Sequence, residues 1–304
     1  MIKILLRLTL LLALFSLPPS RLGQAVEAQP QWKRLESKNF IVFYENTSEG
    51  RKILREAKAA YPRITSEFNY YPLAKTSIYV YHSHSLFLAK SPAGITRAYS
   101  QPFMSKVFIS ATQKSIEPAV AHEITHIVFL QSLPDPSTVP FWFVEGIAVY
   151  ESEPNQESAD IEAYALQGKA HSIFDLSKEN PEGREEEQKV AAEGYVIVNF
   201  IVDEYGRDGL SRLIQNLQKG FGFSIALRKS LGASEGEIDR AWYKYASVHS
   251  RRVYIQNLRY LGFLILGLLV VVASGVWIGK RRRELRELEE GEAEESLDQE
   301  DMPV

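Results

Sequence analysis

One five-residue pattern in an apolar segment places the strongest constraint on the local fold. His122 and His126 flank Glu123-Ile-Thr, and apolar residues continue on both sides from Ala119 to Leu130. Histidines at positions i and i+4 lie on one face of an α-helix, one turn apart. Buried polar side chains need partners. The pattern therefore predicts a helix over 116–132 in which two imidazoles meet at one point.

A second apolar segment carries an acidic residue that needs a partner as well. Glu145 lies 19 positions after His126, within Phe141–Glu151. An isolated carboxylate is costly to bury unless it is paired or bound to a metal. The proline-containing loop 134–140 separates the two predicted helices closely enough for Glu145 to return over the histidines. Two histidines and one carboxylate leave a fourth position for water, which is typical of catalytic zinc.

Glu123 is predicted to work beside the metal as a proton acceptor. One residue of helix turns it by about 100° from His122, so it reaches a metal-bound water rather than the ion. The chain has no cysteine, which excludes disulfides, thiolate metal sites and a cysteine nucleophile. The predicted cofactor is therefore Zn²⁺ held by histidine and carboxylate.

The order of the predicted elements indicates an α+β fold. Three short apolar segments have the composition of strands, and helical spacing dominates after residue 116. Strands followed by helices are typical of α+β domains. The predicted strands are 40–44, 76–81 and 106–110, and the predicted helices are 48–70, 116–132, 140–152, 158–169, 185–205, 208–219, 224–231 and 234–249. The segment 91–104, with two prolines and a glycine, is expected to be loop or broken strand.

The pattern around Glu145 also carries a family resemblance. His-Glu-x-x-His, followed after 19 positions by the glutamate of Trp-x-x-Glu-Gly-x-Ala-x-Tyr, resembles the gluzincin clan of zinc metallopeptidases. It is most similar to the peptidase MA-like domains of bacterial exported proteins, over residues 37–248. The resemblance implies a zincin-like metallopeptidase domain, with His122, His126 and Glu145 as zinc ligands and Glu123 as general base and acid.

Several positions bear on details of that resemblance. Thermolysin-like enzymes have an aspartate four positions after the ligand glutamate, where this chain has Val149, so the residues that support the ligands must differ. The chain has no Gly-Ala-Met-Glu-Asn motif, so an aminopeptidase that binds the substrate amino terminus is not supported. The strand 106–110 is expected to bind an extended peptide, as the strand before the His-Glu-x-x-His helix does in the family.

A donor to the developing oxyanion is also needed besides the metal. Tyr195 is the candidate, and a core aromatic residue at this position is an equally good interpretation. The weaker alternatives are Tyr150, Tyr164 and His171, whereas His82, His84 and His249 are expected on the surface.

The two ends of the chain predict a membrane topology. Residues 1–28 have a basic start, an apolar core and small residues near Ala25, as in a signal peptide; an uncleaved anchor is the alternative. Residues 261–279 carry no charge and are long enough for one transmembrane helix, and Lys280-Arg-Arg-Arg follows as a cytoplasmic stop-transfer cluster. The predicted organisation is 1–28 signal peptide, 29–250 extracytoplasmic domain, 251–260 juxtamembrane segment, 261–279 transmembrane helix and 280–304 cytoplasmic tail, acidic and disordered.

These features predict a membrane-anchored extracytoplasmic zinc metallopeptidase that hydrolyses peptide bonds, as an endopeptidase acting on peptides or proteins. The 35 basic and 38 acidic residues nearly balance, which argues against nucleic-acid binding. The alternative is a non-catalytic, peptidase-like surface module that binds or senses a ligand. Hydrolysis of a non-peptide amide or an ester is a third possibility. The sequence does not predict the oligomeric state.

Overall fold

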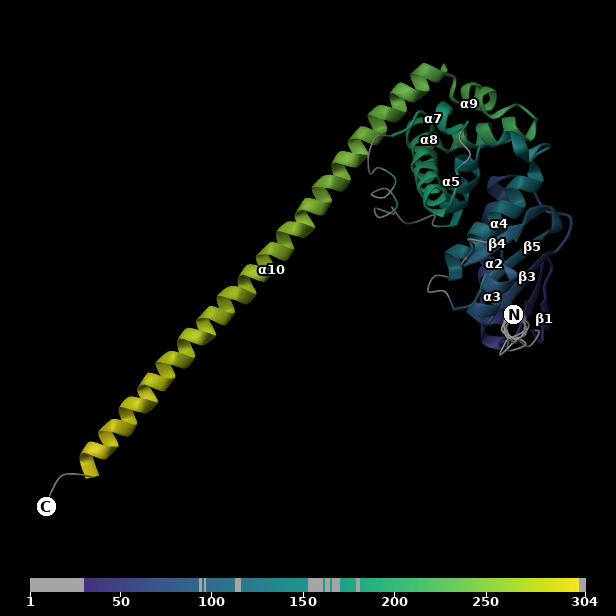
Figure 1. Ribbon diagram of the computed structural model, residues 1–304. Coiled ribbons are helices and arrows are strands. Elements are labelled where there is room, and N and C mark those ends of the chain that lie inside the picture. Colours follow the sequence, from purple (N-terminus) through teal and green to yellow (C-terminus); the bar gives the residue numbers. More distant parts are fainter. Residues whose placement is uncertain are drawn as a thin grey trace, which may run out of the picture. The chain divides into compact units, whose positions relative to one another are not determined.

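The computed structural model describes residues 30–300, apart from 93–94, 96, 113–115, 153–160, 162–164, 166–169 and 179–180, and within the last helix it leaves out the side chains of 252–261, 264, 284–285 and 287–300. The predicted signal peptide, residues 1–28, lies outside this part of the chain. The fold contains two compact units, which divide between Pro136 and Ser137 (Figure 1).

The first unit is built around a sheet of five strands in the order β1-β2-β3-β5-β4. β2, β3 and β5 are parallel, and the outer strands β1 and β4 are antiparallel to their neighbours. The strands predicted over 40–44, 76–81 and 106–110 are confirmed with the same limits. β1 was not predicted, and β4 lies within 91–104, which was expected to be loop or broken strand. The bounds are β1 Lys33–Glu36, β2 Phe40–Tyr44, β3 Thr76–Tyr81, β4 Ala98–Gln101 and β5 Lys106–Ser110.

The position of β4 corrects one expectation about the sheet. The strand over 106–110 was expected to offer a free edge to a peptide, but β5 pairs with β3 on one side and with β4 on the other. β4 is therefore the outer strand of the described sheet. The sequence signal for β4 is weak because it has four residues, directly before Pro102, and returns into β5 through a tight turn in which Ser105 has a left-handed φ of 48°.

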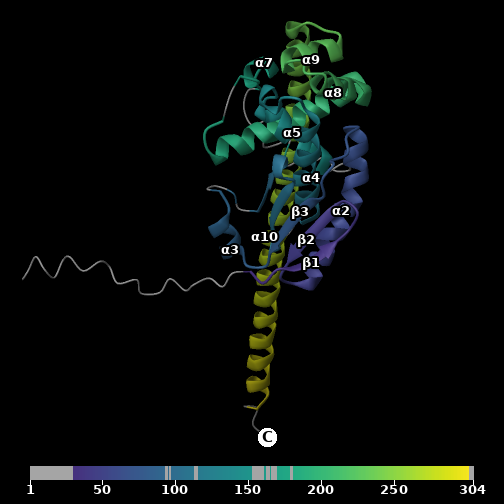
Figure 2. The same cartoon turned by 90° about the vertical axis from the view of Figure 1, so that its right-hand side faces the viewer.

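Two long helices pack together and against the sheet (Figure 2). Buried side chains alternate along β2, with Phe40 and Val42 fully inside. The rings of Phe68, at the end of α2, and Phe129, in α4, lie 5.2 Å apart and close the core between these helices. The helices of this unit are α2 Thr47–Glu67, α3 His84–Lys90, the 3-10 turn η1 Pro102–Met104 and α4 Ile116–Ser132.

The second unit is helical, as predicted. The helices expected over 185–205 and 208–219 form α8, which is interrupted where Gly206 has a φ of 73° and a ψ of 166°. The helix predicted over 158–169 falls largely outside the described residues. The helices are α5 Phe141–Ser152, α7 Ile173–Leu176, α8 Arg184–Gln218, α9 Phe223–Leu231 and α10 Glu235–Glu300, after a short 3-10 turn η2 Pro136–Thr138.

α10 is one continuous helix across several predicted segments. It takes in the helix expected over 234–249, the juxtamembrane segment 251–260 and the apolar segment 261–279. Within the part of the chain that the structure describes, no helix has a stretch both long and apolar enough to cross a membrane. The helix continues past Gly291 to Glu300, where a disordered tail was expected. Four of the ten residues from 291 to 300 are glutamate, which favours helix.

α5 and α8 cross with their backbones in direct contact. A Cβ atom on Gly146 would lie 2.4 Å from the Gly194 carbonyl carbon, and one on Gly194 would lie 2.1 Å from the Trp142 carbonyl oxygen. Only glycine leaves space for so close an approach. The crossing therefore fixes where α5, which carries Glu145, lies on α8.

We predict that Gly194→Ala destabilises the protein by about 1–3 kcal/mol or more, because the added methyl overlaps backbone atoms that cannot rotate away. The measurement is the free energy of unfolding in urea. Gly236→Ala is the matched control: the nearest atom to its added Cβ is an Arg240 side-chain nitrogen at 3.6 Å, and alanine favours helix. Equal stability of the two variants would contradict the close crossing.

A histidine–glutamate pair joins β3 to α2 in the first unit. His82 Nδ1 lies 2.8 Å from Glu49 Oε1, and this hydrogen bond, together with the carboxylate charge, raises the pKa of His82 above its usual value. The raised pKa means that the pair stabilises the fold at pH values below the unfolded histidine's pKa of about 6.5. That stabilisation is lost as the pH rises through the higher folded pKa.

We therefore expect Glu49→Gln to lower the pKa of His82 toward about 6.5 and to weaken the loss of stability as the pH rises. NMR titration of the His82 ring gives the pKa directly. The wild-type protein, titrated under the same conditions, gives the reference pKa of His82. An unchanged His82 titration would show that the pair does not form.

Candidate metal centre

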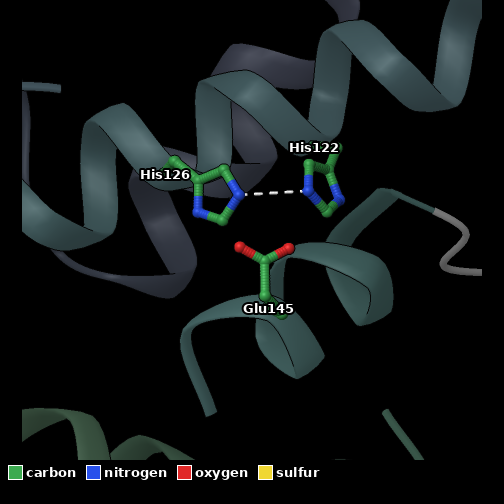
Figure 3. Close-up of side chains that lie close together, drawn as sticks. All are labelled: His122, His126 and Glu145. Carbon is green, nitrogen blue, oxygen red and sulfur yellow. Dashed lines mark hydrogen bonds between the residues drawn. The ribbon is translucent and has the colours of Figure 1, made fainter. Parts of the chain in front are cut away.

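α4 carries its polar side chains into an apolar interior. Glu123, Thr125 and His126 are 6%, 0% and 8% exposed, and every residue from Ile124 to Phe129 is buried. The Thr125 hydroxyl is satisfied within the helix, since Oγ1 donates to the Ala121 carbonyl at 2.9 Å. The imidazoles of His122 and His126 reach beyond the helix and meet beside it (Figure 3).

The two histidines meet as the helical spacing predicts. His122 Nε2 and His126 Nε2 are 3.0 Å apart, and the rings are nearly perpendicular, with centroids 4.6 Å apart. Figure 3 shows both rings projecting from α4 toward the carboxylate of Glu145 on α5. One ligand atom from each of the three residues lies within 4.8 Å of the other two. This geometry brings together the three predicted ligands.

The donor set fits a small divalent ion. Ligand atoms about 2.0–2.1 Å from a tetrahedral zinc lie roughly 3.3 Å from one another, close to the 3.0 Å between the two Nε2 atoms. Two ring nitrogens and a carboxylate oxygen are ligands that zinc takes. His126 is buried and His122 and Glu145 are half-buried, so an ion in this group would be partly shielded from solvent. The group is thus able to hold a metal ion.

Large aromatic side chains hold the segment of α5 that precedes Glu145. Trp142 and Phe143 are fully buried, and both rings lie 5.3 Å from the ring of Phe223 at the start of α9. Trp142 Nε1 also donates to Ser177 Oγ at 2.9 Å. The α5 segment is therefore fixed by packing on one side and by the glycine crossing on another.

Sequence reasoning missed a second polar cluster close to that crossing. Glu193 is 2% exposed and uses both carboxylate oxygens on one residue: Oε1 accepts from the His171 backbone N–H and Oε2 lies 2.8 Å from His171 Nδ1. Trp242 Nε1 donates to the His171 carbonyl at 2.8 Å. The His171 side chain is nevertheless 44% exposed. A buried acid next to Gly194, within an apolar helix, was the available signal.

The segment after His171 is fixed by the first turns of α10. Asp239 accepts from Ser172 Oγ at 2.6 Å and from the Ile173 backbone N–H at 3.0 Å. Together with Trp242, this acid ties residues 171–173 to α10. His171 consequently has a fixed backbone and an oriented ring.

The other predicted residues have different surroundings. Tyr195 lies on α8 directly after Gly194 and is 3% exposed, and its role in catalysis stays a prediction. Tyr150 packs under the Arg207 guanidinium, 6.0 Å from the ring centre, and Tyr164 lies outside the described residues. His82 and His84 are exposed as predicted, whereas His249 is half-buried and stacks on Tyr245.

Comparison with known proteins finds a family match for the larger part of the chain. Residues 77–248 match the sequence profile of the peptidase MA superfamily. This match begins in β3 and takes in α4, α5 and the crossing with α8. No curated protein matches the chain.

Proposed function

Since the chain belongs to the peptidase MA superfamily, we propose that it is a zinc metallopeptidase that hydrolyses internal peptide bonds of peptides or proteins. The observation that carries the proposal is the group of His122, His126 and Glu145 with a buried glutamate, Glu123, on the same helix as the histidines. Two histidines and one carboxylate are the donor set of a catalytic rather than a closed structural zinc site.

Zinc bound by these three residues would supply a Lewis acid that polarises the scissile carbonyl and lowers the pKa of a water molecule to about 7. The imidazole nitrogens and the carboxylate would hold the ion with a fourth position open. No cysteine is present to close that position.

Glu123 supplies the proton transfer in this proposal. Its carboxylate takes a proton from the attacking water while the water oxygen forms a bond to the carbonyl carbon. The same carboxyl group then gives the proton to the amide nitrogen as the carbon–nitrogen bond breaks, so protons balance over the cycle. The 6% exposure of Glu123 keeps bulk water from competing for that proton.

An oxyanion donor is proposed as well. Tyr195 is our first candidate, because it follows Gly194 at the crossing with the helix that carries Glu145. His171 is the alternative, supported by an exposed ring whose orientation is fixed by Glu193. A donor of this kind contributes about 10²–10³-fold to the rate.

The outer strand supports an extended substrate. β4 pairs only with β5 within the described sheet, so its other edge has backbone groups with which a peptide can pair. The absence of the Gly-Ala-Met-Glu-Asn motif favours an endopeptidase over an enzyme that binds a free amino terminus. We propose β4, rather than β5, as the strand that aligns the peptide.

We further propose that the catalytic domain, 29–250, is extracytoplasmic and anchored in the cell membrane by a single span. The support is the signal-peptide pattern of 1–28, the uncharged segment 261–279 and the four basic residues that follow it. The tail 280–304 would then be cytoplasmic.

The second candidate is a non-catalytic surface module that binds peptides and retains only the peptidase fold. A binding module has no need of a proton acceptor next to the metal ligands, and Glu123 is therefore the observation that disfavours it.

We predict that Glu123→Gln lowers hydrolysis by at least about 10²–10⁴-fold, because the amide cannot accept the proton, while zinc stays near one equivalent. Cleavage of a peptide library and metal analysis of the purified protein give the two quantities. His126→Ala should lose both zinc and activity. Glu117→Gln, at an exposed position in the first turn of the same helix, is the matched control and should keep both.

Full activity of the Glu123 variant would refute the mechanism. Zinc binding by the wild-type protein with no cleavage of any peptide would instead favour the binding module.

We predict that Tyr195→Phe lowers kcat by about 10²–10³-fold with little change in KM, since the donor acts on the transition state. His171→Gln is compared directly, and the larger loss of kcat identifies the donor. Tyr243→Phe, at a position 39% exposed, is the control. If neither variant lowers kcat, both assignments are wrong.

A further inference from the structure

Exposed apolar side chains of the first unit concentrate at one end of its sheet, where β3 and β5 begin. Among the described residues of this unit, the large hydrophobic residues that are exposed are Tyr71 at 61%, Leu73 at 102%, Leu88 at 42%, Phe103 at 72% and Met104 at 59%. All except Leu88 belong to two connections, 69–75 before β3 and the η1 turn before β5. Single exposed apolar residues are ordinary, whereas a group of them marks an interaction site.

The sheet topology brings these two connections side by side. β3 and β5 are parallel neighbours, with Ser77 opposite Lys106, so their amino ends are one strand spacing apart, about 4.8 Å. The Ser77 backbone N–H, near the start of β3, donates to the Ser105 carbonyl at 2.8 Å and joins β3 to the end of the η1 turn. Tyr71, Leu73, Phe103 and Met104 therefore form one group, which we call the apolar edge.

The backbone beneath the apolar edge is held in place. Gln131 Nε2, at the end of α4, donates to the Pro102 carbonyl at 2.6 Å and to Ser105 Oγ at 2.9 Å. On the other side, the Tyr70 N–H donates to the Thr65 carbonyl and closes the end of α2. Internal hydrogen bonds thus fix the turns while their apolar side chains face solvent.

The shape and charge of the apolar edge favour a bilayer as its occupant. Leu73, in the connection before β3, is fully exposed and Phe103, in η1, is 72% exposed, so both side chains are free to enter a lipid interface. Three lysines lie at the same end of the sheet: Lys38, in the turn between β1 and β2, Lys75 and Lys106. Glu36 is paired with Lys75, while Lys38 and Lys106 form no ion pair with the described residues. Apolar tips with basic neighbours complement anionic lipid headgroups.

We propose that the apolar edge is a lipid-contacting surface, through which Leu73 and Phe103 insert into the interface of an anionic membrane. This contact is separate from the metal centre and is in addition to the span proposed for 261–279. It would hold the first unit against the bilayer and restrict the substrates that reach it to those near the membrane surface. The inference is motivated by the proposed membrane location but can be tested apart from it.

The absence of native cysteine allows a site-specific test with the full chain. Leu73→Cys, Phe103→Cys, Leu88→Cys and Val270→Cys are each labelled with an environment-sensitive fluorophore and reconstituted with vesicles of mixed phosphatidylcholine and phosphatidylserine. Quenchers placed in the acyl chains report depth. We expect quenching at 73 and 103 and none at 88, the matched exposed position on α3. Position 270 reports independently whether α10 inserts.

Each pattern of quenching leads to a decision. Quenching at 270 but not at 73 or 103 overturns the apolar edge and leaves the membrane span standing, whereas the reverse pattern supports the apolar edge and overturns the span. A change at 73 and 103 that depends on protein concentration and needs no lipid identifies a second copy of the chain as the occupant and overturns the proposal. Replacing both Lys38 and Lys106 by Glu should reduce the quenching at 73 and 103 several-fold.

Discussion

The free-energy cost of burying polar side chains on the apolar helix α4 determines how the candidate metal centre is built. α4 is buried along most of its length and still carries Glu123, Thr125 and His126 in its interior part. Thr125 is satisfied by its own helix, but an imidazole pair 3.0 Å apart and a facing carboxylate are satisfied best by a shared cation. The burial of these side chains therefore makes the group of His122, His126 and Glu145 suited to hold a metal ion.

A second constraint is the contact between α5 and α8. With glycines on both helices, the backbones approach until a methyl group no longer fits between them. Such a contact has little freedom to slide, so the residues next to it inherit defined positions. Glu145 precedes one of these glycines, and Glu193 and Tyr195 flank the other. Side chains that are far apart in the sequence are thereby fixed around one crossing.

Periodicity was sufficient to predict the elements that position the metal group. Helical spacing placed His122 and His126 on one face, and alternation with β-branched and aromatic residues located three strands with the correct limits. The costs of burial predicted Glu145 as the third member. These predictions worked because each depends on short-range geometry and on residue types that have few alternatives.

Long-range pairing accounts for what the sequence did not predict. β1 and β4 have four residues each and exist because neighbouring strands complete their hydrogen bonds, so their own sequences carry a weak signal. The role of Glu193 was missed for a similar reason, since its partner His171 lies 22 positions away across a connection. The peptide-binding edge was assigned to β5 from the family resemblance, because no local signal showed that β4 would pair on the outer side of β5.

The hydrogen bonds from Asp239 and Trp242 to residues 171–173 have a consequence for how the protein can be divided. They come from the first turns of α10, so the beginning of this helix completes the fold of the second unit, and Trp242 is fully buried there. The first turns of α10 therefore belong to the folded second unit. The boundary between this unit and the rest of α10 must lie within the helix, after these turns. The fold and its extension share one uninterrupted backbone, with no hinge of glycine or proline between them.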